Sequence, residues 1–266
     1  MLLQYRDFLL GVPGLMTIAI TIVIFIILNL ILAIIMIYKG IKMKYYTMLL
    51  ISGIFFAGVS AWGGVVFNLM YILITDTFPT WIWTAYFITQ GGFLFLFHFI
   101  WIAGVAKLAN ISKNKQKYLL IIVGILIAIL EGVYWTIIFT NISLLGVTSF
   151  PFIIDYSWIS YFYLTTSLGF FVVGGFWISI SSLRSSDSRL KLKSKFLLVW
   201  VILILFGSII EIYRPIWISL FLSSLDVMDA AIILSYTAKI ILTIAVISGY
   251  IGFMLPKRIE KVFLKT

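Results

Sequence analysis

The chain of 266 residues is 63% hydrophobic and only 11% charged, whereas soluble domains are usually about 25% charged. This composition excludes a soluble protein. The absence of cysteine excludes disulfides, thiolate metal sites and cysteine nucleophiles. The net charge of +10 would suggest nucleic-acid binding in a soluble chain. In a membrane protein, however, basic residues are also sorted by topology, so their positions have to be examined first.

Seven apolar segments follow one another along the chain, and each is long enough to cross the roughly 30 Å hydrocarbon layer as a helix. They predict an all-α, polytopic membrane protein: a seven-transmembrane helix bundle that forms a single domain over residues 1–266. The predicted spans are residues 13–38, 46–75, 80–106, 118–140, 157–183, 196–223 and 228–255. The segments between them are short, and none is a Gly/Ser-rich or Pro-rich linker. The start of the chain lacks the pattern of a removable signal, so the first span is expected to stay in the protein.

The basic residues are sorted to one side of the predicted membrane. Sixteen of the nineteen follow spans 1, 3, 5 and 7, whereas the opposite segments hold one, Arg6, against five acids. The positive-inside rule therefore predicts a multi-pass cell-membrane protein with its N-terminus outside and its C-terminus in the cytoplasm. This sorting explains the net charge without nucleic acid. The inner basic segments are instead expected to attract anionic lipid headgroups.

Polar residues inside the predicted spans need an explanation, because a charge at the bilayer centre costs about 2.5–3.5 kcal/mol. Depths counted from the outer ends of the spans, at about 1.5 Å per residue, place two acids and two bases in one layer near the midplane. These residues are Glu131 of span 4, Glu211 and Arg214 of span 6, and Lys239 of span 7. Asn68 of span 2 and Gln90 of span 3 lie at a similar level.

Span 6 combines charge with a helix breaker. Glu211 and Arg214 are three residues apart, so their side chains share a face of the helix. Pro215 has no amide hydrogen, which leaves the carbonyl of residue 211 without its helical partner and predicts a kink.

Two interpretations of the charged layer remain open. The four charges could form a neutral structural network, with Glu211 paired to Arg214 and Glu131 paired to Lys239. They could instead line a water-filled or ligand-filled cavity that opens to the outside, which we favour because pairing alone rarely offsets the desolvation of four ions. His98 is the single histidine and is expected to be neutral and hydrogen-bonded inside span 3, so no metal site is predicted.

Sequence signatures of enzymes are missing. The chain has no Gly-rich phosphate loop, no HExxH and no nucleophile elbow, and we do not expect it to be an enzyme. No predicted inner segment is long enough to hold a catalytic output domain. Any signal would therefore have to pass to a separate cytoplasmic partner.

Two strings near the predicted inner face resemble a known class of protein. Residues 249–256 read GYIGFMLP and precede a basic tail, and a basic segment at 184–195 leads into span 6. In these features the chain resembles the seven-helix sensor modules that occur ahead of histidine kinases and as stand-alone membrane proteins. The resemblance implies a sensory role.

A second resemblance concerns the last two spans. Residues 237–240 read TAKI, with Lys239 in the middle of span 7, and Tyr213, Pro215 and Trp217 lie on span 6. The chain is similar in these features to microbial rhodopsins, whose lysine carries retinal as a Schiff base. That family usually has an aspartate where Ser235 stands. Span 3 has no acidic residue either, so Glu211 or Glu131 would have to serve as the counterion.

These observations predict a seven-helix membrane protein of sensory or receptor type with an outward-facing polar site. A small ion or an amphipathic metabolite is the expected ligand. A small-solute or ion transporter or channel is one alternative. A retinal-binding photoreceptor or pump, with Lys239 as the covalent anchor, is the other, and no other cofactor is expected.

Overall fold

A computed structural model describes residues 7, 10–11, 14–77, 81–109, 111–150, 153–222 and 225–264, and only the backbone of residues 147–150, 153–155, 258 and 261. The predicted span ends at residues 13, 80 and 223 lie outside the described residues, as do Arg6 and the basic residue Lys265.

The described chain contains seven helical segments that are long and apolar enough to cross a membrane, which points to a multi-pass membrane protein. Two of the seven predicted spans are each divided into two consecutive helices. The helices are α2 (Leu15–Lys42), α3 (Thr47–Thr75), α4 (Ile82–Gly91) with α5 (Leu94–Leu108), α6 (Lys113–Thr140), α7 (Trp158–Leu183), α8 (Ser188–Ile212) with α9 (Arg214–Phe221), and α10 (Val227–Met254).

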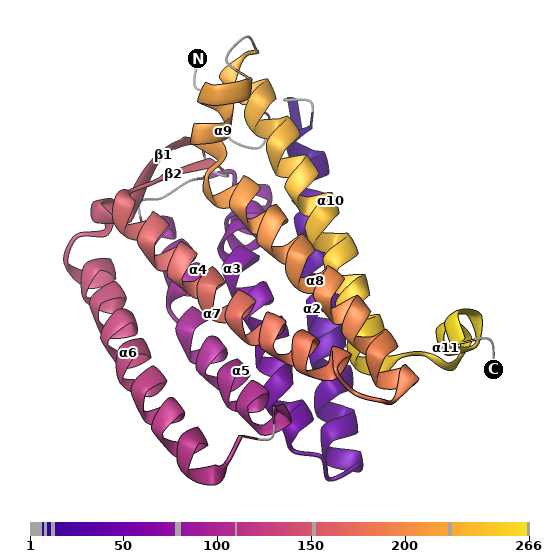
Figure 1. Ribbon diagram of the computed structural model, residues 1–266. Helices are drawn as coiled ribbons and strands as arrows, with labels where there is room; N and C mark the ends of the chain where they lie inside the picture. Colours follow the sequence, from indigo (N-terminus) through magenta and orange to yellow (C-terminus); the bar gives the residue numbers. More distant parts are fainter. Residues whose placement is uncertain are drawn as a thin grey trace.

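Several elements fall outside the seven apolar segments. An antiparallel hairpin of β1 (Gly146–Phe150) and β2 (Ile153–Tyr156) follows the short helix η1 (Ile142–Leu144), and a last helix, α11, covers Lys257–Leu264. In the hairpin Gly146 pairs with Tyr156 and Phe150 with Ile153. Figure 1 shows the hairpin and α9 at one end of the bundle and α11 at the other.

Helix α8 begins eight residues before the predicted start of span 6. The Asp187 side chain accepts a hydrogen bond of 2.8 Å from the Arg189 amide and so caps the helix at its first turn. The basic residues from 189 to 195 therefore lie in the first turns of α8 and not in a loop. Of the basic segment 184–195, only residues 184–187 lie between the two helices α7 and α8.

Six of the spans form a closed ring. Helix α2 packs against α3, α3 against α5, α5 against α7, α7 against α8, α8 against α10, and α10 returns to α2. Helix α6 packs outside this ring against α4 and α5, so that α6 and α10 lie on opposite sides of the bundle (Figure 1). Only three residues of α6 are buried, which fits a helix that faces lipid over most of its surface.

Close contact between helices depends on glycine at three positions of the α8–α10 pair. A Cβ atom at Gly207 would come within 2.8 Å of the Leu242 side chain. Gly249 and Gly252 would meet Trp200 and Leu197 in the same way, at 3.0 and 2.7 Å. Small residues at such positions allow helix backbones in a membrane to approach closely.

Candidate functional site

The central feature of the site is a break in span 6. Helix α8 ends at Ile212, Tyr213 takes the non-helical angles φ −99° and ψ 22°, and α9 begins at Arg214 with Pro215 in its first turn. The interruption lies two residues before Pro215. It separates Glu211, the last but one residue of α8, from Arg214, the first of α9.

Three charged residues meet at this break, and we call them the Glu211 triad. Lys239 Nζ on α10 lies 3.1 Å from Glu211 Oε2, and Arg214 Nη1 lies 3.6 Å from Glu211 Oε1. Arg214 Nη1 also donates a hydrogen bond of 2.9 Å to Ser235 Oγ. Lys239 is fully buried, and its Nζ lies 4.8 Å from the centre of the Trp62 ring. One carboxylate therefore pairs with two cations and links α8 and α9 to α10.

Glu131 does not belong to this triad. It lies on α6, on the far side of the bundle from α10, and Lys239 pairs with Glu211 in its place (Figure 1). The pairing of Glu131 with Lys239 that the structural interpretation assumed is therefore wrong. Depth along the membrane normal can be counted from the sequence, but the position of a helix around the bundle cannot.

Glu131 instead accepts backbone hydrogen bonds at the break between α4 and α5. In a continuous helix the amides of Phe95 and Leu96 would donate to the carbonyls of Gly91 and Gly92. At the break, Glu131 Oε1 accepts both amide hydrogen bonds, at 2.9 and 3.3 Å. The carboxylate thus caps the N-terminus of α5 and interacts favourably with its helix dipole.

The two carbonyls left free at the same break also have partners. Tyr163 Oη of α7 donates to the Gly91 carbonyl at 2.7 Å, and Trp135 Nε1 of α6 donates to the Gly92 carbonyl at 2.9 Å. The break therefore replaces two helical hydrogen bonds by four bonds to side chains of neighbouring helices. A Cβ atom at Gly91 would collide with Tyr134, which shows why glycine is required there.

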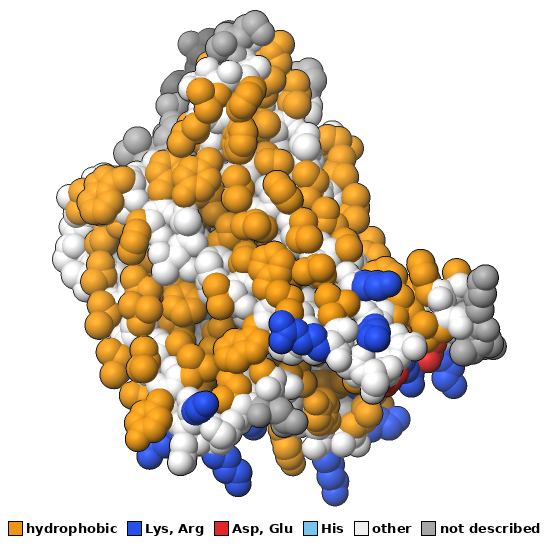
Figure 2. Space-filling view, viewed as in Figure 1, with side chains coloured by type: hydrophobic (Ala, Val, Ile, Leu, Met, Phe, Trp, Pro, Cys, Tyr) orange, Lys and Arg blue, Asp and Glu red, His pale blue; other side chains and the backbone are white. Residues whose placement is uncertain are grey.

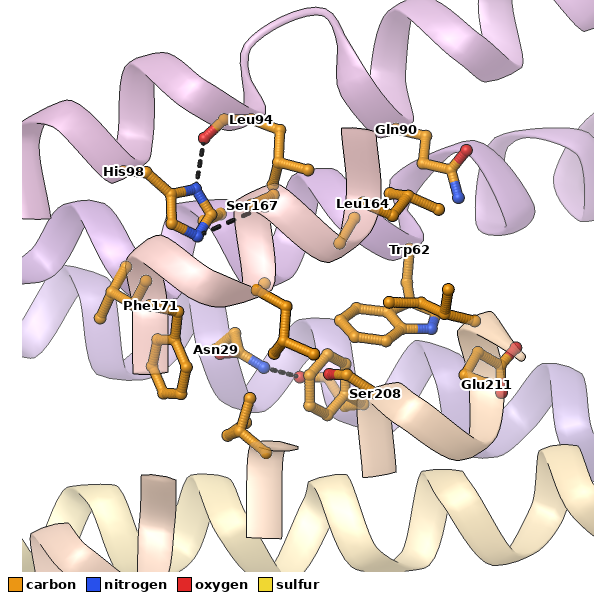
Figure 3. A pocket seen from close by; sticks show the side chains of 18 of the residues that line it. Asn29, Trp62, Gln90, Leu94, His98, Leu164, Ser167, Phe171, Ser208 and Glu211 are labelled. Carbon is orange, nitrogen blue, oxygen red and sulfur yellow. Dashed lines mark hydrogen bonds between the residues drawn. The ribbon is translucent and has the colours of Figure 1, made fainter. Parts of the chain in front are cut away.

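A cavity of about 120 Å³ lies in the middle of the ring beside the triad. Its lining comes from α2, α3, α4, α5, β2, α7, α8 and α9. Figure 3 shows its two ends: Trp62, Gln90 and Glu211 lie at one, which we call the triad end, and His98 and Ser167 lie at the other, which we call the His98 end. Arg214 also lines the cavity, whereas Lys239 and Asn68 are not among its lining residues.

The hairpin reaches the triad end of the cavity through Tyr156. Its phenol oxygen accepts a hydrogen bond from Gln90 Nε2 and lies 3.3 Å from Tyr86 Oη. Burial raises the pKa of the Tyr156 phenol above its ordinary value, which keeps the phenol neutral. The sequence did not indicate Tyr156 as a site residue, because Tyr156 lies at the end of a segment without an apolar run.

The His98 end is polar without being charged. His98 Nδ1 lies 2.7 Å from the Leu94 carbonyl and must therefore carry the proton, which leaves Nε2 as an acceptor 3.5 Å from Ser167 Oγ. The histidine is buried and hydrogen-bonded, but it also lines the cavity, which the sequence did not indicate.

Asn68 has no evident role in the cavity. Its side chain on α3 is fully buried, and neither its Oδ1 nor its Nδ2 has a hydrogen-bond partner among the described residues.

The residues of the site suit neither a metal ion nor retinal. Among the described residues, no three His, Asp or Glu side chains gather as a metal site would need. Retinal does not fit the residues present: Lys239 is not among the residues that line the cavity, its amine is paired with Glu211, and a cavity of about 120 Å³ is too small for this long polyene. We therefore assign no step to retinal.

Comparison with known proteins gives no relative: no family model, no curated protein and no solved structure matches the chain. The geometry of the Glu211 triad and its cavity is therefore the basis for a functional proposal.

Proposed function

We propose that the protein is a sensor or receptor of the cell membrane that detects a small molecule in the cavity beside the Glu211 triad. The observation that carries this proposal is the double role of Glu211 and Arg214. Both line the cavity, and both join the broken span 6 to α10, Glu211 through its ion pair with Lys239 and Arg214 through its hydrogen bond to Ser235. A molecule that binds in the cavity can therefore compete with the contacts that hold these helices together.

The proposed orientation has its N-terminus outside and its C-terminus in the cytoplasm. Figure 2 shows Lys and Arg side chains gathered toward the end of the bundle that carries α11, while hydrophobic side chains cover the remaining surface in this view. Inner segments of membrane proteins carry an excess of such residues. In this orientation the hairpin and the triad end of the cavity face the outer side, and the basic end meets anionic lipid headgroups.

A change at the triad would be passed along α8 and α10 to the inner side. The two helices are in close contact at Gly207, Gly249 and Gly252, and Ser248 Oγ of α10 donates a hydrogen bond of 2.8 Å to the Phe196 carbonyl of α8. Packed helices respond to a local change by small rigid shifts and rotations. A cytoplasmic signalling partner that contacts the basic first turns of α8 would respond to such a shift.

The absence of cysteine allows a direct test, since spin labels can be placed in an otherwise unmodified chain. Leu190→Cys on α8 and Tyr46→Cys before α3 are both exposed at the basic end. Their distance distribution would be measured by pulsed electron paramagnetic resonance in liposomes, with and without Glu211→Gln. Because this substitution removes the carboxylate from both ion pairs, we expect the distance to shift by about 1–2 Å or more.

Asp229→Asn is the matched control, since it removes one acid from an exposed position of α10 and should leave the distance unchanged. An identical distribution in the native chain and in Glu211→Gln would contradict the proposed coupling.

A transporter or channel is the second candidate, because charged side chains beside an intramembrane cavity also suit a permeation site. Solute or ion flux in proteoliposomes that disappears in Glu211→Gln would favour this function. A sensor should bind its ligand without such flux.

A further inference from the structure

We propose that the cavity binds a short monocarboxylate, with its carboxylate on Arg214 and its apolar chain directed toward His98. This inference rests on the proposed function and specifies the chemical class of the ligand. It follows from the charge at the triad, the free donors of Arg214, and the shape and lining of the cavity.

The first step concerns charge. The four intramembrane charges sum to zero in the sequence, but the structure separates Glu131 from the other three and binds it at the N-terminus of α5. The triad is left with two cations and one carboxylate, and hence with one positive charge in excess. Among the described side chains that line the cavity, Glu211 is the only Asp or Glu and Arg214 the only Lys or Arg. Uncompensated charge inside a membrane is costly, so an anion at this position would be stabilising.

The second step concerns the hydrogen-bond donors of Arg214. Its Nη1 is occupied by Ser235 and Glu211, while Nε and Nη2 have no partner among the described residues. A guanidinium group binds a carboxylate through two parallel N–H donors, which is the strongest pairing available to it. Arg214 can therefore bind a carboxylate through Nε and Nη2 while its Nη1 keeps the hydrogen bond to Ser235.

The third step concerns the rest of the cavity. Apart from these polar groups the lining is mainly apolar and aromatic, with Phe55, Leu168 and Trp200 among its members. At the far end, the acceptor His98 Nε2 and Ser167 Oγ lie together, as Figure 3 shows. This lining fits an unbranched apolar chain, and a terminal hydroxyl group would find hydrogen-bond partners at the His98 end.

The fourth step concerns size. A dry protein cavity of roughly 150 Å³ accommodates benzene, so the volume of about 120 Å³ fits a chain of about six carbon atoms. The lining residues Trp200 and Glu211 are eleven positions apart on α8, or about 16 Å along the helix. The cavity is therefore long and narrow, which favours a linear chain over a ring.

The test uses the purified full-length protein and four probes with the same chain: hexanoate, hexanamide, hexan-1-ol and hexylamine. Binding is measured by calorimetry and by the melting temperature from tryptophan fluorescence. We expect hexanoate to bind and to raise the melting temperature in a saturable manner, and the other three to have no effect. 6-Hydroxyhexanoate should bind more tightly than hexanoate.

Variants then locate the site. Arg214→Gln should weaken hexanoate binding by about tenfold or more, because the charge-assisted pair is lost. Arg184→Gln is the matched control: it removes the same charge between α7 and α8 and should leave binding unchanged.

A second variant keeps the test decisive if Arg214→Gln does not fold. Ala61→Leu adds apolar volume to the cavity wall from α3 and changes no charge. It should abolish hexanoate binding and retain that of propionate.

Equal binding of hexan-1-ol or hexylamine, or no binding of any straight-chain acid from acetate to decanoate, would overturn the proposal. The spin-label distances in Glu211→Gln require no ligand. A shift there together with the absence of carboxylate binding would overturn the ligand class alone, whereas unchanged distances with carboxylate binding would overturn only the sensor function.

Discussion

Glu131 and Glu211 are two acids at similar depth in apolar helices, and their partners give them different roles. Glu131 accepts two backbone hydrogen bonds at the N-terminus of α5, so its charge is balanced by amide donors and a helix dipole. Glu211 is balanced by two cationic side chains on other elements. We therefore expect Glu131 to matter for stability and Glu211 for response.

Replacement of Glu131 separates these roles. Glu131→Ala should lower the free energy of unfolding by about 1–3 kcal/mol, because it leaves the Phe95 and Leu96 amides at the start of α5 without an acceptor. Thermal melting and amide exchange at Phe95 and Leu96 would measure the effect. Glu131→Gln keeps a carbonyl acceptor and should lose less. If the two substitutions were equally harmless, the carboxylate would not be the cap of α5.

At this scale the sequence predicts that the charges are buried but not how they are paired. Counting residues from the span ends places Glu131 and Glu211 at one depth, because helices have a fixed rise per residue. It cannot say which helices are neighbours, and so the pairing of Glu131 with Lys239 in the structural interpretation was wrong. The Gly91–Gly92 pair was the available signal for the break that Glu131 serves.

Among the elements, the broken span 6 determines the geometry of the site. After the interruption at Tyr213, Arg214 contacts Ser235 on α10 and Glu211 on the other side of the break. A continuous helix would place Arg214 on one regular face with Glu211. The break therefore positions the guanidinium group between α8, α10 and the cavity.

Pro215→Ala tests the cause of the break. Alanine restores an amide that can donate to the Glu211 carbonyl, so α8 and α9 should become more nearly continuous. We expect the variant to be as stable as the native chain or more so, by up to about 1 kcal/mol, and to show a changed spin-label distance between α8 and α3. Circular dichroism and thermal melting would follow the helix. An unchanged distance together with an unchanged melting temperature would show that tertiary contacts alone maintain the break.

The long helices could be predicted from apolar length, because a run of about 20 apolar residues in water-poor surroundings has one stable conformation. The shorter elements could be predicted only in part. Pro215 predicts a kink where span 6 is broken, but the α4–α5 break lies inside an apolar run, and the hairpin at 146–156 has too few residues for a pattern. Helix α11 is amphipathic, with Ile259, Val262 and Phe263 at helical spacing, but it falls in a stretch that reads as a basic tail.

For the molecule as a whole, charge is distributed along the bundle axis. Lys and Arg side chains collect at one end, and a single excess positive charge remains beside the cavity. The proposed orientation places the first group in the cytoplasm and the second within the membrane.

Cysteine labelling tests this orientation in the cysteine-free chain. Thr77→Cys and Lys115→Cys replace exposed residues at opposite ends of the bundle. A membrane-impermeant maleimide added to intact cells should label Thr77→Cys at once, and Lys115→Cys only after permeabilisation. The reverse pattern would invert the proposed topology and place the triad end on the cytoplasmic side.

The depth of the cavity would also make the binding of an anionic ligand dependent on membrane voltage. A unit charge that crosses the whole membrane changes its energy by about 2.3 kcal/mol per 100 mV. An anion that enters from outside and stops about half-way moves against the inside-negative potential. A potential of 100 mV would then weaken its binding about sevenfold. The occupancy of the site should therefore rise when the cell loses its membrane potential, even at a constant ligand concentration, and the protein would report electrical and chemical conditions together.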